Sequence, residues 1–178
     1  MDADTLRELV LKCIAAEYPA ELWRGRLNRE IGKTATDDET LRALNYLRDR
    51  GSIEWRMDGG TYVYRLTPAG WRSSYGANPD VTDLAGAIVD VLCLEYPHHV
   101  AEQTLLGALL EKRGMSGVST GDYEAAIGYL VQCGYAAARD AVAAAGERVI
   151  DRRREYKLTA LGIDLAEEKI SDAGVTQA

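Results

Sequence analysis

The pattern of apolar and polar residues predicts helices followed by a β-hairpin in the first half of the chain. Apolar residues recur at helical spacing over 5–17. A second helix is predicted over 20–31, where Gly32 follows as a stop signal. Further along, β-rich runs occupy 52–56 and 61–66, and a compact Asp-Gly-Gly turn separates them.

A third helix lies between these segments and has the clearest start and stop signals. Thr36 offers a hydroxyl cap and is followed by three acids, which favour the positive end of the helix dipole. Gly51 closes the helix. We expect Leu41, Leu44 and Leu47 to form its buried face.

Two short sequence motifs that each occur twice indicate that this order of elements is repeated along the chain. Residues 64–70 read Tyr-Arg-Leu-Thr-Pro-Ala-Gly, and residues 156–162 read Tyr-Lys-Leu-Thr-Ala-Leu-Gly. Upstream, Glu-Tyr-Pro stands at 17–19 and again at 95–97. Two repeated motifs in the same order predict an internal duplication. The second copy is expected to contain helices at 83–95, 101–113 and 120–133, a long hairpin at 135–158, and a closing helix at 159–170.

The duplication predicts two domains in a mainly α chain with small β-hairpin wings, an α+β fold. We place the first domain at 1–76, a linker at 77–80 and the second domain, with its longer wing, at 81–171. Residues 172–178 are expected to form a disordered tail.

Three helices followed by a two-stranded wing resemble the winged-helix domains of bacterial regulators, with the PadR and MarR groups the nearest. The residues that carry this resemblance are Leu44, Leu47, Gly51, 58–60 and 64–70 in the first copy, and Ile127, Leu130, Gly134 and 156–162 in the second. The resemblance implies two tandem winged-helix domains. In these domains the Leu of the repeated Tyr-x-Leu-Thr motif packs in the core, and the Thr caps the segment after the wing.

Composition is typical of a globular protein, with 47% apolar and 28% charged residues. The sequence contains no 18-residue apolar run and no signal-peptide pattern at its start, so we expect neither a membrane span nor membrane binding. Its three cysteines are odd in number and lack zinc-ligand spacing. Free thiols in a reducing cytoplasm are the expected state.

The net charge of −7 belongs to the second half of the chain. Residues 1–76 carry 12 acids and 12 bases, whereas residues 77–178 carry 16 acids and 9 bases. Affinity for nucleic acid comes largely from neutralising phosphates, so this balance argues against indiscriminate binding but leaves room for a local basic face.

No pattern of catalytic or metal-binding residues is present. The only histidines are His98 and His99, which are adjacent and have no cysteine or carboxylate cluster beside them. The sequence has no phosphate-binding glycine loop. We expect no enzyme activity, no metal and no small-molecule cofactor.

The residues predicted to contact nucleic acid are basic side chains on the second helix and the wings, together with basic, amide and aromatic side chains on or beside the outward face of the third helix. A helix-turn-helix reader inserts its third helix into the major groove, while second helices and wings contact phosphates. The candidates are Arg24, Arg26, Arg29, Lys33, Arg42, Asn45, Tyr46, Arg56, Arg152, Arg153 and Arg154.

Two functions stay open. The first is a DNA-binding regulatory or accessory protein whose partner is duplex DNA. The second is an acidic winged-helix adaptor that binds another protein and no DNA, as the chromosome-segregation partner of the bacterial condensin complex does, to which the likeness is one of architecture alone. Acids beside Arg42 and the absence of Lys and Arg from 120–133 favour the second. The repeated helix order favours the first.

Overall fold

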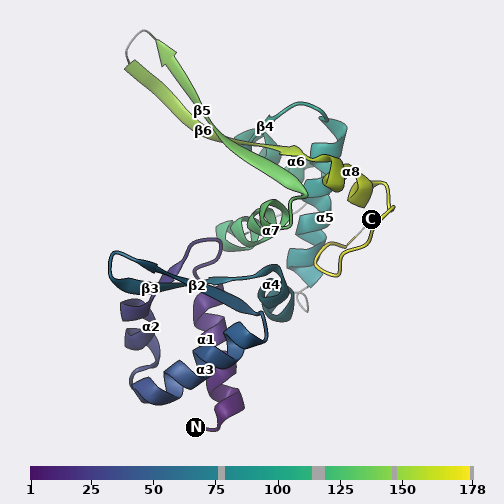
Figure 1. Ribbon diagram of the computed structural model, residues 1–178. Helices are drawn as coiled ribbons and strands as arrows, with labels where there is room; N and C mark the ends of the chain where they lie inside the picture. Colours follow the sequence, from purple (N-terminus) through teal and green to yellow (C-terminus); the bar gives the residue numbers. More distant parts are fainter. Residues whose placement is uncertain (76–78, 114–118, 146–147, 177–178) are drawn as a thin grey trace. The chain divides into compact units, whose positions relative to one another are not determined.

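The computed structural model divides the chain into two compact units, Met1–Ala77 and Asn78–Ala178. It describes residues 1–75, 79–113, 119–145 and 148–176. These residues form eight helices and two three-stranded antiparallel sheets, an α+β architecture (Figure 1).

The two units have the same order of elements. The first contains α1 Ala3–Ala15, β1 Leu22–Trp23, α2 Arg24–Ile31, α3 Asp37–Asp49, β2 Ile53–Asp58, β3 Thr61–Leu66 and α4 Pro68–Tyr75. The second contains α5 Pro79–Leu94, β4 Val100–Ala101, α6 Glu102–Arg113, α7 Thr120–Gln132, β5 Ala136–Ala145, β6 Arg148–Leu158 and α8 Ala160–Ala166. Strand order is also the same, β1-β3-β2 in one sheet and β4-β6-β5 in the other.

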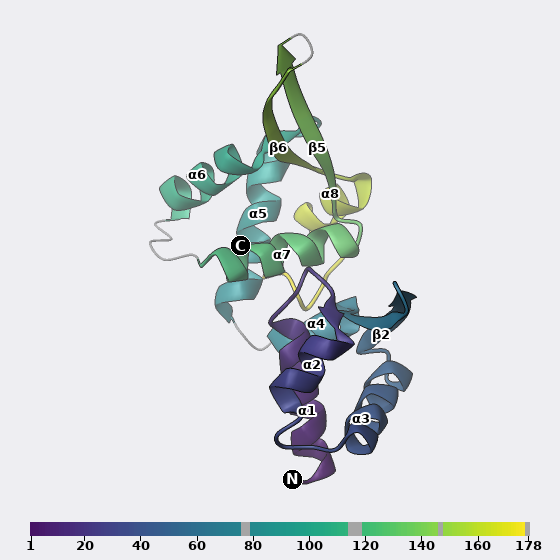
Figure 2. The ribbon, with the colours of Figure 1, turned by 90° about the vertical axis from the view of Figure 1, so that its left-hand side faces the viewer.

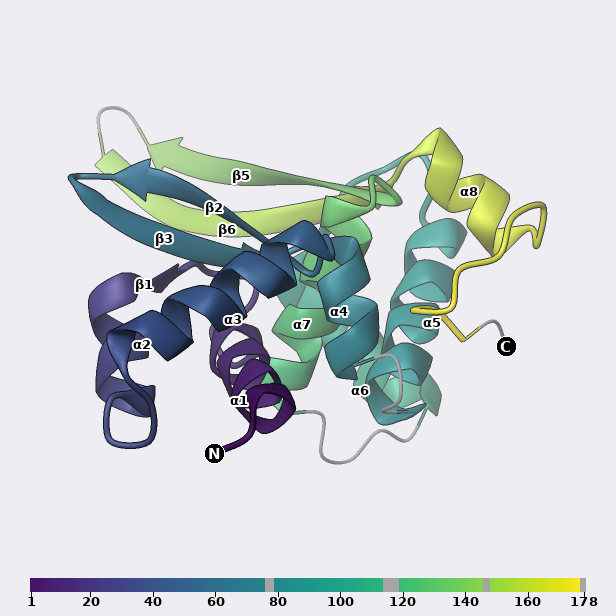
Figure 3. The ribbon, with the colours of Figure 1, turned by 60° about the horizontal axis from the view of Figure 1, so that its bottom comes forward.

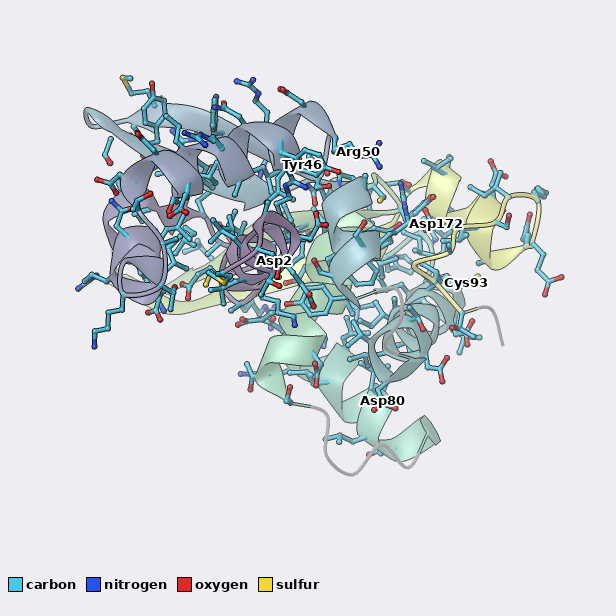
Figure 4. All side chains as sticks on the ribbon, turned by 90° about the horizontal axis from the view of Figure 1, so that it is seen from below. Asp2, Tyr46, Arg50, Asp80, Cys93 and Asp172 are labelled. Atoms are coloured by element: carbon cyan, nitrogen blue, oxygen red, sulfur yellow. The ribbon has the colours of Figure 1, made fainter. Side chains whose placement is uncertain are left out.

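Side-chain caps start α1 and α3; α3 begins after the predicted cap Thr36, whereas α1 spans Ala3–Ala15 instead of the predicted 5–17. Asp2, labelled in Figure 4, accepts hydrogen bonds from the backbone of Asp4 and Thr5 at the start of α1. At the start of α3, Thr36 and Glu39 form a reciprocal capping box.

The buried face of α3 differs from the predicted one. It consists of Thr40, Ala43, Leu44 and Leu47, whereas Leu41 is 44% exposed. The prediction placed Leu41 in the core because it assigned all three leucines of this helix to the buried face. The actual stripe follows the spacing of Thr40, Leu44 and Leu47, and the Thr40 hydroxyl is satisfied by the carbonyl of Thr36 at 2.9 Å.

The segment predicted as one helix over 20–31 is a short strand followed by a helix. Leu22 pairs with Tyr64 and Trp23 with Val63, so β1 adds a third strand to the hairpin. The same feature recurs at β4, where Val100 pairs with Tyr156. The sequence-based prediction missed both strands because a two-residue strand has no periodicity of its own.

The repeated Tyr-x-Leu-Thr-x-x-Gly motif is a backbone corner between the hairpin and the helix after it. Thr67 donates to the carbonyl of Gly51 and accepts from the N–H of Gly70 at 3.0 Å, so it joins the end of α3 to the start of α4. In the second unit, Thr159 donates to the carbonyl of Gly134 at 2.6 Å and accepts from the N–H of Gly162 at 3.1 Å. The expected capping role of this Thr is therefore confirmed in both units.

The glycine of the motif allows two backbones to touch. A Cβ at Gly70 would lie 1.8 Å from the carbonyl oxygen of Ser52, and one at Gly162 would lie 2.1 Å from that of Tyr135. Both distances are far below van der Waals contact. Because no larger residue fits without moving the backbone, glycine is required here for close approach.

The tail predicted to be disordered is held against the second unit as far as residue 176. The carboxylate of Asp172 accepts hydrogen bonds from the hydroxyls of Tyr129 and Tyr135. Val175 is buried, and the N–H of Thr176 donates to the carbonyl of Thr82 on α5 at 3.1 Å. Figure 3 shows this segment returning from α8 along α5. The tail was expected to be disordered because it lies at the end of the chain, but its polar groups form these hydrogen bonds.

Two residues of the predicted linker 77–80 belong to a helix in the structure. Pro79 and Asp80 are the first residues of α5, a helix in which proline at the first position loses no hydrogen bond. Residues 77–78 of this predicted linker, and residues 177–178 of the predicted tail, lie outside the described residues.

Replacing Gly162 with alanine tests the backbone corner. We expect Gly162→Ala to lower the free energy of unfolding of the second unit by about 2 kcal/mol, since the added Cβ overpacks against the carbonyl of Tyr135. Gly107→Ala in α6 is the matched control: nothing lies within 4 Å of its Cβ position, so the change should stabilise by about 0.5–1 kcal/mol through helix propensity. Urea unfolding followed by circular dichroism measures both. Equal stability of the two variants would contradict the close approach.

Candidate nucleic-acid interface

The first two arginines of α2 are already engaged within the first unit. Arg24 donates to the hydroxyl of Tyr64 at 3.2 Å and lies 4.0 Å from Asp37. Arg26 pairs with Glu17 at 2.8 Å. Only 20% of the Arg24 side chain is exposed, so it contributes to the core edge more than to an outer surface.

Three other predicted bases of this unit are exposed and form no ion pair within the described part of the chain. Arg29 lies on α2, Lys33 follows it, and Arg42 lies on α3. Arg42 faces Glu39, one of the acids at the start of α3. Asn45, predicted beside Arg42 on the outward face, is half-buried. The surface of α3 therefore alternates in charge, an arrangement that repels phosphate as much as it attracts it.

Tyr46 faces outward on α3, as predicted, and is stacked by arginine. The guanidinium of Arg7 lies 3.8 Å from the centre of its ring, and that of Arg50 lies 6.0 Å away. Tyr46 and Arg50 are labelled in Figure 4. Its exposed ring is partly occupied by these cation–π contacts, which leaves less of it for a base or a peptide.

The outer face of the first wing is balanced by acids. Arg56 donates to both carboxylate oxygens of Glu21, at 3.0 and 2.8 Å, and lies 3.4 Å from Asp58. Its hydrogen bonds hold the pKa of Glu21 below the usual value, so the acid stays ionised. Arg65 donates from Nε and Nη2 to one carboxylate oxygen of Glu54, its cross-strand neighbour. On this face three acidic side chains therefore lie beside two basic ones, which leaves no excess of positive charge.

The third helix of the second unit lacks the exposed basic side chains that a groove reader uses. Tyr123, Ile127 and Tyr129 are buried, and Ala125, which stands at the position of Arg42, is 1% exposed. The helix carries no Lys or Arg. Its buried residues belong to the core, where α7 packs against α5 (Figure 2).

The outer face of the second wing is different because bases outnumber acids on it. Side chains alternate between the two faces of a strand, and cross-strand partners share a face. Arg139 pairs with Glu155, Ala141 with Arg153, and Ala137 with Lys157. Among the side chains that the structure describes, one face of the hairpin therefore carries Arg139, Arg153 and Lys157 around one acid, Glu155. This group of four residues is called the wing-two face below.

Glu155 is at the centre of the wing-two face. Oε2 accepts from Nε and Nη2 of Arg139 at 2.9 and 2.7 Å, and Oε1 lies 3.3 Å from Nε of Arg153. The hydrogen bonds from Arg139 lower the pKa of this carboxyl group more than the loss of hydration raises it, so Glu155 is ionised at neutral pH. The arginine side chains remain 56% and 54% exposed.

His99, just before β4, borders the wing-two face. Its pKa is lowered by loss of hydration and by the nearby charges of Arg139 and Lys157, while Glu155 acts in the opposite direction. The imidazole is therefore neutral at pH 7.

The predicted basic run at 152–154 is divided by strand alternation. Arg153 lies on the wing-two face, but Arg154 lies on the other face, 3.6 Å from Asp140 and hydrogen-bonded to Tyr156. The side chain of Arg152 lies outside the described part of the structure.

Sequence reasoning missed Arg139 and Glu155 because their importance depends on strand register. An isolated arginine among alanines in 136–145 has no motif. The signal available was the alternation in 153–157, which puts Arg153, Glu155 and Lys157 on one face of any strand.

The described residues hold no group of three His, Cys, Asp or Glu side chains that could bind a metal ion. No disulfide joins the three cysteines, which are half-buried. Within the same residues, no helix has both the length and the apolar character needed to cross a membrane.

Comparison with known proteins does not assign the chain to a family. No protein-family model matches the sequence, and no curated protein does. Among solved structures, the chain is similar to the crystal structure of a conserved hypothetical protein from Chlorobium tepidum, with 17% identity over 92% of this chain and 96% of that one, and a TM-score of 0.30. A TM-score this low supports no conclusion about fold or function.

Neutralising Glu155 tests the electrostatics of the wing-two face. We expect Glu155→Gln to lower the pKa of His99 further, because it removes the one charge that favours the imidazolium. A proton NMR titration of the imidazole measures the shift. In the wild type, His99 should titrate below 6.5, so the unfolded chain binds more protons between that pKa and 6.5, and stability should rise with pH across this window. An unchanged pKa of His99 in the variant would show that the two groups do not interact.

Proposed function

We propose that the chain is a non-catalytic accessory protein, built of two winged-helix units, that binds the phosphate backbone of duplex DNA through the wing-two face. The observation that carries the proposal is the excess of basic over acidic side chains there, of which Arg139 and Arg153 are exposed and Lys157 is half-buried. Among the described side chains these three surround one acid, whereas the first wing has an acid for each of its arginines.

Support for two winged-helix units comes from the matching element and strand orders of the two halves and from the repeated Thr-x-x-Gly corner. In winged-helix proteins, wings contact phosphates beside the groove that the third helix enters. Here both third helices are poor readers, since α3 alternates in charge and α7 has a buried outer side. The proposed binding is therefore largely independent of sequence.

The spacing of the bases suits contact with more than one phosphate. Arg153 and Lys157 are four residues apart on β6, a distance of about 13 Å along a strand. Arg139 lies across from them on β5. Three phosphate contacts would give a slope of log affinity against log salt of about −2.7.

Removing two wing arginines tests the proposal against a closely matched control. Arg139→Ala with Arg153→Ala should flatten the salt slope by about 1.8. The control, Arg56→Ala with Arg65→Ala, removes two arginines of similar exposure from the first wing and should leave the slope unchanged, because acids already neutralise them. Fluorescence anisotropy with a short duplex, between about 50 and 200 mM salt, covers the range in which such contacts show.

Two results would overturn the proposal. One is the absence of any complex with duplex DNA at the lowest salt. The other is an equal loss in both double variants, which would mean that net charge and not the wing-two face determines binding.

A second candidate function, a protein-binding adaptor, is favoured by apolar exposure on the first wing. Met57 and Tyr62, cross-strand partners near the hairpin turn, are 62% and 45% exposed. Tyr62 stacks beside Trp55, on which Arg48 of α3 lies at 4.6 Å. Exposed aromatic, Met and Arg side chains are typical of protein interfaces. This candidate gains if no duplex binds while Met57→Ser with Tyr62→Ser abolishes a stoichiometric protein complex.

A further inference from the structure

The acid at the centre of the wing-two face has a role that the excess of bases alone does not explain. We propose that Glu155 is an internal anion that holds Arg139 and Arg153 facing solvent and, by its own charge, limits how tightly they bind a phosphate. The inference rests on the proposed function, because it concerns the strength of binding at the same face.

The first support is the burial of Glu155 relative to its partners. It is 7% exposed and is the one charged residue that is buried among those the structure describes. Both arginine side chains above it are more than half exposed. The carboxylate therefore lies beneath two guanidinium groups, which cover it and present their outer edges to water.

The second support is the number of arginine N–H donors that do not bond to Glu155. A guanidinium has five N–H groups. Arg139 uses those on Nε and Nη2 for one oxygen of Glu155, and Nε of Arg153 lies 3.3 Å from the other oxygen. Within the described residues, Nη1 of Arg139 and both terminal nitrogens of Arg153 have no acceptor. Each arginine keeps donors for a phosphate oxygen while its orientation is held from below.

The third support is the contrast with the first wing. The offset of 92 between the Tyr-x-Leu-Thr motifs places Val63 at the position of Glu155. There the central position is apolar, and each arginine is neutralised by its own acid, Arg56 by Glu21 and Arg65 by Glu54. In the second wing one acid orients two arginines, which leaves a net positive charge while still fixing their geometry.

Glu155 has two opposite effects on phosphate binding: it orients the arginines, which favours binding, and its negative charge repels the phosphate. The relative size of the two effects determines whether a substitution at Glu155 raises or lowers the affinity for DNA. Glutamine keeps the length of the side chain and an oxygen that accepts from Arg139, so orientation is largely retained. It removes one negative charge from beneath the bound phosphate. Two unit charges about 7 Å apart in water interact by about RT, which corresponds to roughly threefold in affinity. The charge effect should therefore dominate.

The test compares Glu155→Gln with a variant of equal charge change in the other unit. Anisotropy titrations of the full chain with a short DNA duplex at about 100 mM salt should show Glu155→Gln binding about threefold more tightly than wild type. Glu54→Gln, which also frees a wing arginine of its acid and raises the net charge by one, is the control and should change affinity less. Thermal melting by circular dichroism verifies that each variant is folded.

A third variant separates orientation from charge. Glu155→Ala removes the same charge and the acceptor, so it should bind less tightly than Glu155→Gln. Equal binding by the two variants would overturn the orienting role. Unchanged or weaker binding by Glu155→Gln would overturn the limit on affinity, provided that wild type binds. If neither wild type nor any variant forms a complex, the proposed function itself fails.

Discussion

The two units depend on one backbone contact, the approach of the helix after the wing to the residue that follows the third helix. At Gly70 and Gly162 a carbonyl oxygen occupies the space that a side chain would need. The threonine three residues earlier bonds to the carbonyl that precedes this contact, so hairpin, third helix and following helix meet at one point. The buried Tyr and Leu of the motif, at 64 and 66 or 156 and 158, pack immediately beside it. This corner sets the direction in which each wing leaves its unit.

With the backbone determined in this way, the two wings differ mainly in their outward side chains. The first hairpin is short and has its charges paired around an apolar centre. The second is longer, and an acid at its centre supports arginines on either side. The same arrangement of strands therefore gives one nearly neutral surface and one cationic surface within an acidic chain. Local register, and not overall charge, determines where basic side chains gather on the surface.

Much of the fold was predictable because its signals are local. Thr36 with Glu39, the positive-φ glycines after each third helix, and the repeated Thr-x-x-Gly each act within a few residues of chain. Errors arose where distant residues decide the structure. β1 exists only by pairing with β3, and the tail is ordered by tyrosines 37 and 43 residues away. The candidate site was predicted only in part for the same reason, since Arg139 meets Glu155 across the hairpin. The error at Leu41 is different, because it lies within one helix, where the neighbouring Thr40 occupies the core position.

The contact between Thr176 and Thr82 has a consequence for biosynthesis. These two residues are 94 positions apart, and their hydroxyls and backbones bond directly beside Gly86, whose missing side chain leaves room for the backbone of Thr176. A ribosome releases the chain from its N-terminus onward, so the first unit can complete its fold while the second is still being made. The second unit can only close after nearly all of its residues have emerged, and contacts of such long sequence separation form slowly. Helix α5 therefore stays partly uncovered until residues 172–176 have been synthesised and can pack against it.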